Sequence, residues 1–203
     1  MISRVFNFMK QSQAVQLNNN VFLDLLSSSS PVKPKPLLDV FINHRGADTK
    51  RNIATLLYDN LKSRNLRPFL DCKNMKPGDK LFDHINSAIL TSKVAVAVFS
   101  PNYCESYFCL HELALIMESR KRVIPIFCDI KPSQLDVMIE RLTCTDDEIQ
   151  RFRWALQEAK DIVGLTFDSY KGNLSEVVTI ASDVIVERLV ELEAEDGNAS
   201  IEY

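Results

Sequence analysis

From residue 37 onward, short apolar runs alternate with amphipathic stretches. Five runs predict β-strands, at residues 38–43, 66–70, 94–99, 123–128 and, more weakly, 164–167. Apolar residues with helical spacing form three stripes: Ile53, Leu56, Leu57 and Leu61; Leu110, Leu113, Ala114 and Met117; and Leu174, Val177, Val178, Ala181, Ile185 and Leu189. Strands that alternate with helices in this way are typical of an α/β protein with a parallel sheet that carries helices on both faces.

The predicted strands differ in their expected place in the sheet. Residues 94–99 are apolar without alternation, so both faces of this strand should be buried at the centre. Pro68 lacks an N–H to donate, which favours an edge position for the second strand. Right-handed crossovers then favour the order 2-1-3-4-5 of a flavodoxin-like five-stranded parallel sheet. In such a sheet ligands bind beyond the carboxyl ends of the strands, beside the switch between the first and third.

The two ends of the chain differ from this core. Residues 1–36 hold Gln and Asn clusters, a serine run and alternating prolines, which predict a disordered leader and an extended Pro/Ser-rich linker. A targeting leader is the alternative, although the segment is poor in arginine. We expect the folded domain to span residues 37–193 and an acidic flexible tail to span residues 194–203.

Composition and charge narrow the class of partner. The 203 residues have a formal net charge of −3 and are 46% hydrophobic, which suits one domain and argues against a nucleic-acid binder. The five cysteines include no Cys-x-x-Cys pair, so neither a disulfide framework nor a zinc site is indicated. No apolar run approaches the roughly 20 residues that cross a bilayer. We expect no metal, no membrane contact and a cytoplasmic location, with the nucleus as a further one.

The loop after the first strand, residues 43–49, turns at Gly46 and enters a helix for which Asp48 or Thr49 is the expected N-cap. Arg45 should project at the mouth of the strand. Its planar charged group suits phosphate or carboxylate, and helix N-terminal amides nearby also favour anions. The alternative is a surface arginine that pairs with Asp48.

The loop after the second strand, residues 71–79, has a Pro-Gly turn at 77–78 and Asp79 as a possible cap of the next helix. Its lysines, including Lys76, make it mildly basic. This suits a lid over a phosphate-bearing ligand, a docking surface or a plain solvated loop. No glycine-rich phosphate fingerprint is present, which argues against a conventional dinucleotide cofactor site.

The segment after the central strand, residues 100–113, runs into a helix that carries Glu112. This residue is two positions after Leu110, so its side chain should point away from the core. Because it lies near the amino end of the helix, we expect the dipole to keep it ionised and able to stabilise a developing cation. Simple solvent exposure is the alternative. Ser106 and Phe108 add a hydroxyl and a ring able to stack on a nucleobase or nicotinamide, although a core or interface role is equally compatible.

Other kinds of catalytic site are not supported. The three histidines, His44, His84 and His111, are scattered and do not have the spacing of a zinc helix. No Gly-x-Ser-x-Gly elbow of an α/β hydrolase is present. A response regulator would need an aspartate at the end of the third strand, where Phe99-Ser100 stands.

Three ordered segments carry a resemblance to a known family. Residues 39–49, Asp-Val-Phe-Ile-Asn-His-Arg-Gly-Ala-Asp-Thr, are similar to D-V-F-L-S-F-R-G-x-D-T, the opening of the TIR domain of plant immune proteins. Gly78-Asp79 matches that family's BB loop. Residues 99–103, followed by 106–113, look like its F-S-x-x-Y and S-x-W-C-L-x-E-L motifs. The resemblance covers residues 37–193, and because no receptor-type region follows it, the chain resembles the TIR-only class.

The resemblance implies that Glu112 is the catalytic glutamate of an enzyme that cleaves the nicotinamide–ribose bond of NAD⁺ or NADP⁺. The product would be ADP-ribose or a cyclic variant, formed from NAD⁺ as substrate and with no separate cofactor. The implied substrate-binding residues are Arg45, Gly46, Lys76, Ser106, Phe108 and Cys109.

In this family activity needs self-association, so the first helix, near residues 48–61, and the last, residues 174–192, are the expected contact faces with other copies or other TIR proteins. A non-enzymatic adaptor that binds other TIR domains is the alternative function. Two departures bear on rate and product: Asn43-His44 replaces the family's usual Ser-Phe, and Phe108 replaces its Trp.

Overall fold

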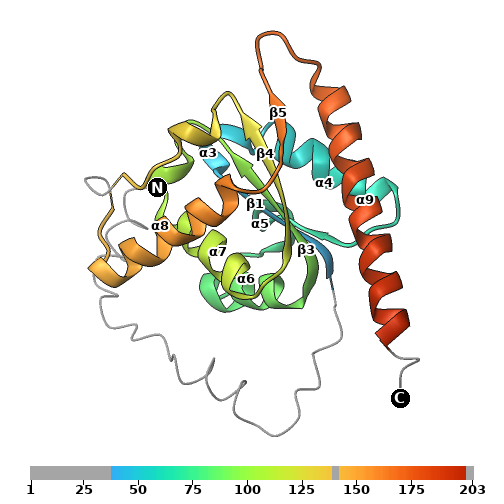
Figure 1. Ribbon diagram of the computed structural model, residues 1–203, viewed down its shortest axis with the longest axis horizontal. Coiled ribbons are helices and arrows are strands. Elements are labelled where there is room, and N and C mark those ends of the chain that lie inside the picture. The colour runs from blue at the N-terminus through green and yellow to red at the C-terminus, as the bar shows by residue number, and fades with distance from the viewer. Residues whose placement is uncertain (1–37, 139–141, 200–203) are drawn as a thin grey trace, which may run out of the picture. The chain divides into compact units, whose positions relative to one another are not determined.

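The computed structural model describes residues 38–138 and 142–199, so the predicted leader, residues 1–36, and residues 200–203 of the predicted tail lie outside it. The described part contains a five-stranded parallel sheet of order β2-β1-β3-β4-β5 (Figure 1). The strands are β1 (Leu38–His44), β2 (Pro68–Phe69), β3 (Ser92–Phe99), β4 (Arg122–Cys128) and β5 (Leu165–Phe167). This confirms the predicted flavodoxin-like order.

The position of each strand follows from its sequence. Residues 94–99 are 0% exposed, as expected of the central strand. β2 lies at the edge of the sheet, where the missing N–H of Pro68 does not cost a hydrogen bond to a second neighbouring strand. At the other edge, β5 pairs with β4 only from Ile126 onward. Gly164, just before β5, passes so close to Pro125 that an added Cβ would lie 2.6 Å from its carbonyl oxygen, so only glycine fits there.

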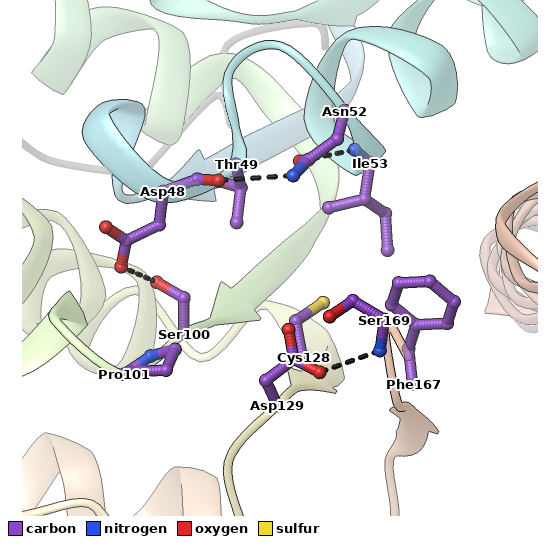
Figure 2. A pocket seen from close by; sticks show the side chains of 10 residues that line it. All are labelled: Asp48, Thr49, Asn52, Ile53, Ser100, Pro101, Cys128, Asp129, Phe167 and Ser169. Atoms are coloured by element: carbon purple, nitrogen blue, oxygen red, sulfur yellow. Dashed lines mark hydrogen bonds between the residues drawn. The ribbon is translucent and has the colours of Figure 1, made fainter. Parts of the chain in front are cut away.

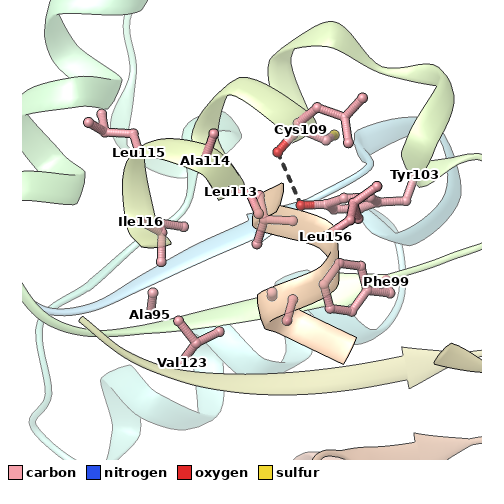
Figure 3. Close-up of a cluster of buried hydrophobic side chains, with 14 of the residues drawn as sticks. Ala95, Phe99, Tyr103, Cys109, Leu113, Ala114, Leu115, Ile116, Val123 and Leu156 are labelled. Carbon is pink, nitrogen blue, oxygen red and sulfur yellow. Dashed lines mark hydrogen bonds between the residues drawn. The ribbon is translucent and has the colours of Figure 1, made fainter. Parts of the chain in front are cut away.

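Helices cover both faces of the sheet, as predicted. Helices α4 (Ile53–Ser63) and α9 (Leu174–Ala199) pack on one face, and α6 (Leu81–Thr91), α7 (Tyr107–Glu118) and α8 (Asp146–Lys160) on the other (Figure 1). Figure 3 shows part of the hydrophobic core on the face covered by α6, α7 and α8, where α7 lies over β3 and β4. Short helices α3 (Gly46–Thr49) and α5 (Asp71–Asn74) follow β1 and β2, and 3₁₀ turns lie at Tyr103–Glu105 and Pro132–Gln134.

Several local expectations were wrong. Helix α8 was not predicted, although Thr145 and Glu148 form a capping box at its start. Leu56, expected in the buried stripe of α4, is 44% exposed. Helix α9 continues to Ala199 through residues expected to form the flexible tail, and Arg122 binds Glu195 there. Within the described ranges, no helix is both long and apolar enough to span a membrane.

Candidate active site

Asn43, the penultimate residue of β1, joins the sheet to the start of α7. Its Nδ2 donates to Glu112 Oε2 at 2.8 Å and to the carbonyl of Cys109 at 3.3 Å. Its Oδ1 accepts from the hydroxyl of Tyr103, which also approaches the Cys109 carbonyl at 3.1 Å (Figure 3). Asn43 and Tyr103 are both 0% exposed, so this network fixes the position of the Glu112 carboxyl group.

Glu112 is partly buried, and its ionisation differs from the prediction. Burial raises the pKa of its carboxyl group to about 8, while the Asn43 bond lowers it and the charge of Asp71 raises it further. The expectation that the helix dipole keeps this group ionised was therefore wrong. A helix end contributes about 0.3–1 kcal/mol, which is less than the cost of removing a carboxylate from water.

Helix α7 places Glu112 through its first turn. Ser106 is the N-cap, and its hydroxyl accepts from the Cys109 N–H at 3.4 Å. Leu110 and Leu113 are buried in the core, which turns Glu112 toward the end of β1. Ser106 is itself only 5% exposed, so it supports the helix that carries the carboxyl group, a capping role that was not predicted.

The thiol of Cys109 is buried beside the end of β1, and two residues of the candidate site affect its pKa. Its Sγ donates to the carbonyl of His44 at 3.4 Å, and burial raises its pKa well above the usual range. The charge of Glu112 raises this pKa as well, whereas the charge of Arg45 lowers it. Both Glu112 and Arg45 are therefore close enough to Cys109 to act on it, and the structure brings these three predicted residues together.

Arg45 has no ion pair in the described part of the chain, and its Nε is buried without a partner there. The alternative, a surface arginine that pairs with Asp48, does not occur. Asp48 instead accepts from Ser100 Oγ at 2.7 Å and from both nitrogens of Asn102 at 3.1 Å. The guanidinium group is thus left available for an anion.

Two further expectations for this loop need correction. Asn52 caps α4, accepting from the Ile53 N–H at 2.6 Å, so the expected caps Asp48 and Thr49 were wrong. A Cβ on Gly46 would approach nothing closer than His44 Cε1 at 4.0 Å, so the fold does not require glycine there.

The Asp48 contacts border a small hollow of about 60 Å³ at the carboxyl edge of the sheet (Figure 2). It is lined by Asp48, Thr49, Asn52, Ile53, Ser100, Pro101, Cys128, Asp129, Phe167 and Ser169. None of the predicted site residues is among them. The hollow is therefore separate from the Glu112 network.

The loop after α5 has the predicted turn, with Gly78 at φ 103°. Asp79 does not cap α6 as expected, because its Oδ2 closes the loop by accepting from the Lys76 N–H at 2.8 Å. Lys76 is exposed, and the structure records no contact between it and Glu112. Its predicted role in binding remains a prediction.

Phe108, the residue in place of the family's tryptophan, is partly buried between two helices. Its ring centroid lies 5.3 Å from that of Phe82 on α6 and 6.0 Å from that of Tyr107. The ring is therefore held by neighbouring aromatic groups rather than free in solvent.

Tyr103 was not given a role in the site from sequence, and Asn43 was noted only as a departure from the family pattern. One signal was available for the role of Asn43, because it is a polar residue at the end of a largely apolar predicted strand, residues 38–43. No group of three or more potential ligands that could hold a metal ion occurs among the residues the structure describes.

A flavodoxin-like sheet with a carboxylate and an arginine at the end of β1 defines the class of the protein, and comparison gives its family. Residues 38–201 match the model of the TIR domain, and the chain belongs to this family.

Plant proteins are among its relatives. The chain is 49% identical over 160 residues to the probable 2′ cyclic ADP-D-ribose synthase BdTIR of Brachypodium distachyon, an alignment of 76% of this chain and 70% of that protein. It is 36% identical over 141 residues to the TMV resistance protein N of Nicotiana glutinosa, covering 62% of this chain and 12% of that protein. The TIR domains of the activated Roq1 resistosome match with a TM-score of 0.64 at 31% identity, over 72% of this chain and 99% of that one.

Proposed function

We propose that this protein cleaves the bond between nicotinamide and ribose in NAD⁺ or NADP⁺, with Glu112 as the catalytic carboxylate. The observation that carries the proposal is the place of Glu112: Asn43 holds it at 2.8 Å at the end of β1, and Arg45 acts on the same buried thiol. The name of the Brachypodium relative, a cyclic ADP-ribose synthase, supports the same chemistry.

In the proposed reaction, the bond between ribose C1′ and the nicotinamide nitrogen breaks. The electron pair leaves with nicotinamide, which becomes neutral, and positive charge develops at C1′. Ionised Glu112 stabilises that charge. Water then adds to C1′ and loses a proton to give ADP-ribose, or a hydroxyl of the same nucleotide adds to give a cyclic product, which the name of the relative favours.

The raised pKa of Glu112 fits a carboxyl group that loses its proton when the substrate binds. At neutral pH most of the free protein carries this group protonated, because its pKa is about 8. The nicotinamide ring of NAD⁺ is cationic, and its approach favours the ionised form. Arg45, which lacks an ion pair in the described structure, would bind the pyrophosphate, with exposed Lys76 as a second positive charge.

We also propose that the protein acts as an assembly with further copies or other TIR proteins. It would do so in plant immune signalling, in the cytoplasm and in the nucleus. The outward faces of α4 and α9 suit such contacts because they expose apolar side chains. Leu56 is 44% exposed, Ile180 43% and Val190 60%. The activated Roq1 resistosome, whose TIR domains match this chain, supports this part of the proposal because a resistosome is an assembly.

The test is nicotinamide release from NAD⁺ by concentrated protein, followed by chromatography. Glu112→Gln keeps the size of the side chain and should abolish release. Glu118→Gln is the matched control on the same helix, because Glu118 pairs with Arg151 away from Asn43. Release by Glu112→Gln at the wild-type rate would disprove the assignment. No release by wild type, with homotypic complexes that tolerate Glu112→Gln, would indicate an adaptor.

A further inference from the structure

His44, the last residue of β1, has a polar partner at each ring nitrogen. Nδ1 lies 2.9 Å from Thr49 Oγ1, and Nε2 lies 3.3 Å from Asp71 Oδ1 at the start of α5. The hydroxyl of Thr49 donates to the carbonyl of Arg45 at 3.0 Å. Because His44 is only 7% exposed, these contacts are its main polar partners. A continuous chain of hydrogen bonds thus joins Asp71 to the turn that carries Arg45.

The number of protons available decides which of these bonds can exist together. The Thr49 hydroxyl has one proton, and the Arg45 carbonyl takes it, so Nδ1 of His44 must donate to Thr49. The Asp71 carboxylate can only accept, so Nε2 must donate as well. All three bonds therefore need a ring that is protonated on both nitrogens. A neutral ring loses either the bond to Asp71 or the bond from Thr49 to Arg45.

We propose that His44 is a positioning residue that ties the loop beginning at Asp71 to the Arg45 turn in a proton-dependent way. The doubly protonated ring keeps both the bond to Asp71 and the bond from Thr49 to Arg45, and loss of one proton breaks one of these two bonds. The tie rests on the proposed function in one respect: the residues it joins border the proposed NAD⁺ site.

Charged and titratable groups around the ring act in both directions. Burial would raise the pKa of Asp71, but the hydrogen bond and charge of His44, with help from Lys50, lower it below its usual range. Asp71 is therefore ionised at neutral pH, so it faces the ring as an acceptor only. The Cys109 thiol on α7 is neutral because burial raises its pKa. Asp71 also raises the pKa of Glu112, so the charge that pairs with His44 acts on the proposed catalytic group too.

The test follows the ring and the two segments in one pH series on the full chain. Nitrogen-15 NMR of the imidazole reports when His44 loses a proton. Hydrogen-exchange mass spectrometry reports the opening of residues 45–50 and 71–75, corrected for intrinsic exchange and referenced to α8. We expect exchange in one of these segments to rise about tenfold at the midpoint of the His44 titration. Exchange that does not follow that midpoint would overturn the proposal.

Two variants separate the tie from folding. His44→Phe removes a buried residue and so tests folding as well, whereas Asp71→Asn changes a side chain that is 52% exposed. Asp59→Asn is the matched control, because Asp59 is 55% exposed and pairs with Lys73 at 3.4 Å. The exchange step should disappear in Asp71→Asn and persist in Asp59→Asn. An exchange step that persists in Asp71→Asn as well as in Asp59→Asn would refute the tie.

Enzyme kinetics supply a second measurement. If wild type releases nicotinamide, its KM for NAD⁺ should rise across the same midpoint, as should that of Asp59→Asn, while the KM of Asp71→Asn stays flat. A wild type without turnover would contradict the proposed function alone, since the exchange experiment still decides whether His44 forms the tie.

Discussion

An Asn43→Leu substitution keeps the branched shape of a side chain that is 0% exposed but removes its polar atoms. Glu112 Oε2 then loses a donor that lies at 2.8 Å. This bond lowers the pKa of Glu112 against the larger effect of burial, so its loss should raise that pKa above about 8. A hydrogen bond to a charged group contributes about 1.5–3 kcal/mol, equivalent to about one to two pKa units.

The assay is kcat/KM for NAD⁺ from pH 6 to pH 9.5, measured by nicotinamide release. In wild type, kcat/KM should rise about tenfold per pH unit below the pKa of the free carboxyl group and then level off near pH 8. In Asn43→Leu the rise should move about one unit or more to higher pH, with a loss of at least about tenfold at pH 7 that shrinks as the pH increases. Asn60→Leu is the control, since Asn60 Oδ1 on α4 is buried without a partner in the described structure.

Two results would refute this reasoning. An equal loss of kcat/KM at every pH would mean that Asn43 shapes the site without tuning Glu112. An unshifted profile with normal activity would mean that Glu112 is not the titrating group.

Two further predictions concern stability and its pH dependence. The raised pKa of Glu112 means that its protonated form stabilises the fold fully below the unfolded-state pKa, and that this contribution is lost as pH rises through about 8. The melting temperature of wild type should therefore fall between pH 6 and pH 8.5 by about 5 °C more than that of Glu112→Gln. Asp39→Asn should lower the free energy of unfolding by about 1–2 kcal/mol at pH 7, because Asp39 accepts from Arg67 Nη2 at 2.8 Å and Nε at 3.0 Å. The bonds from Arg67 lower the pKa of Asp39, so this difference should vanish in urea unfolding as pH falls through that pKa.

Contrary outcomes are equally specific. Parallel melting curves against pH for wild type and Glu112→Gln would show that burial does not raise the pKa of Glu112. A difference between wild type and Asp39→Asn that persists at pH 2 would show that a neutral contact, and not the ion pair with Arg67, stabilises the edge of the sheet.

The sheet order was predictable because its determinants are local. Pro68 restricts the second strand to an edge, and the apolar run 94–99 requires two covered faces. The cap of α4 was not predictable in this way, since Asp48, Thr49 and Asn52 are all good capping residues. Contacts with Ser100 and Asn102, far along the chain, use the Asp48 side chain and leave the cap to Asn52.

The place of Glu112 was predictable, but its ionisation was not. Helical spacing from Leu110 gives the direction of the side chain, which only requires local geometry. Its pKa depends on how much water the folded chain excludes and on Asn43, which lies 69 positions earlier. The helix dipole can be inferred from sequence, but the burial of Glu112 cannot. The sequence therefore predicted the smaller of the two effects on the pKa of Glu112.

At the end of β1, the two residues that depart from the family pattern each contact a carboxyl group. Successive strand residues point to opposite sides, so Asn43 faces Glu112 on α7 while His44 faces Asp71 on α5. The serine and phenylalanine usual in the family cannot make the same contacts: serine has one donor proton on a shorter side chain where Asn43 donates twice, and phenylalanine has no polar atom to bind a carboxylate. Converting Asn43-His44 to Ser-Phe should therefore raise the pKa of Glu112 and remove the pH-dependent tie together. If the converted protein kept the wild-type pH profiles of both kcat/KM and hydrogen exchange, neither residue would have the role given to it here.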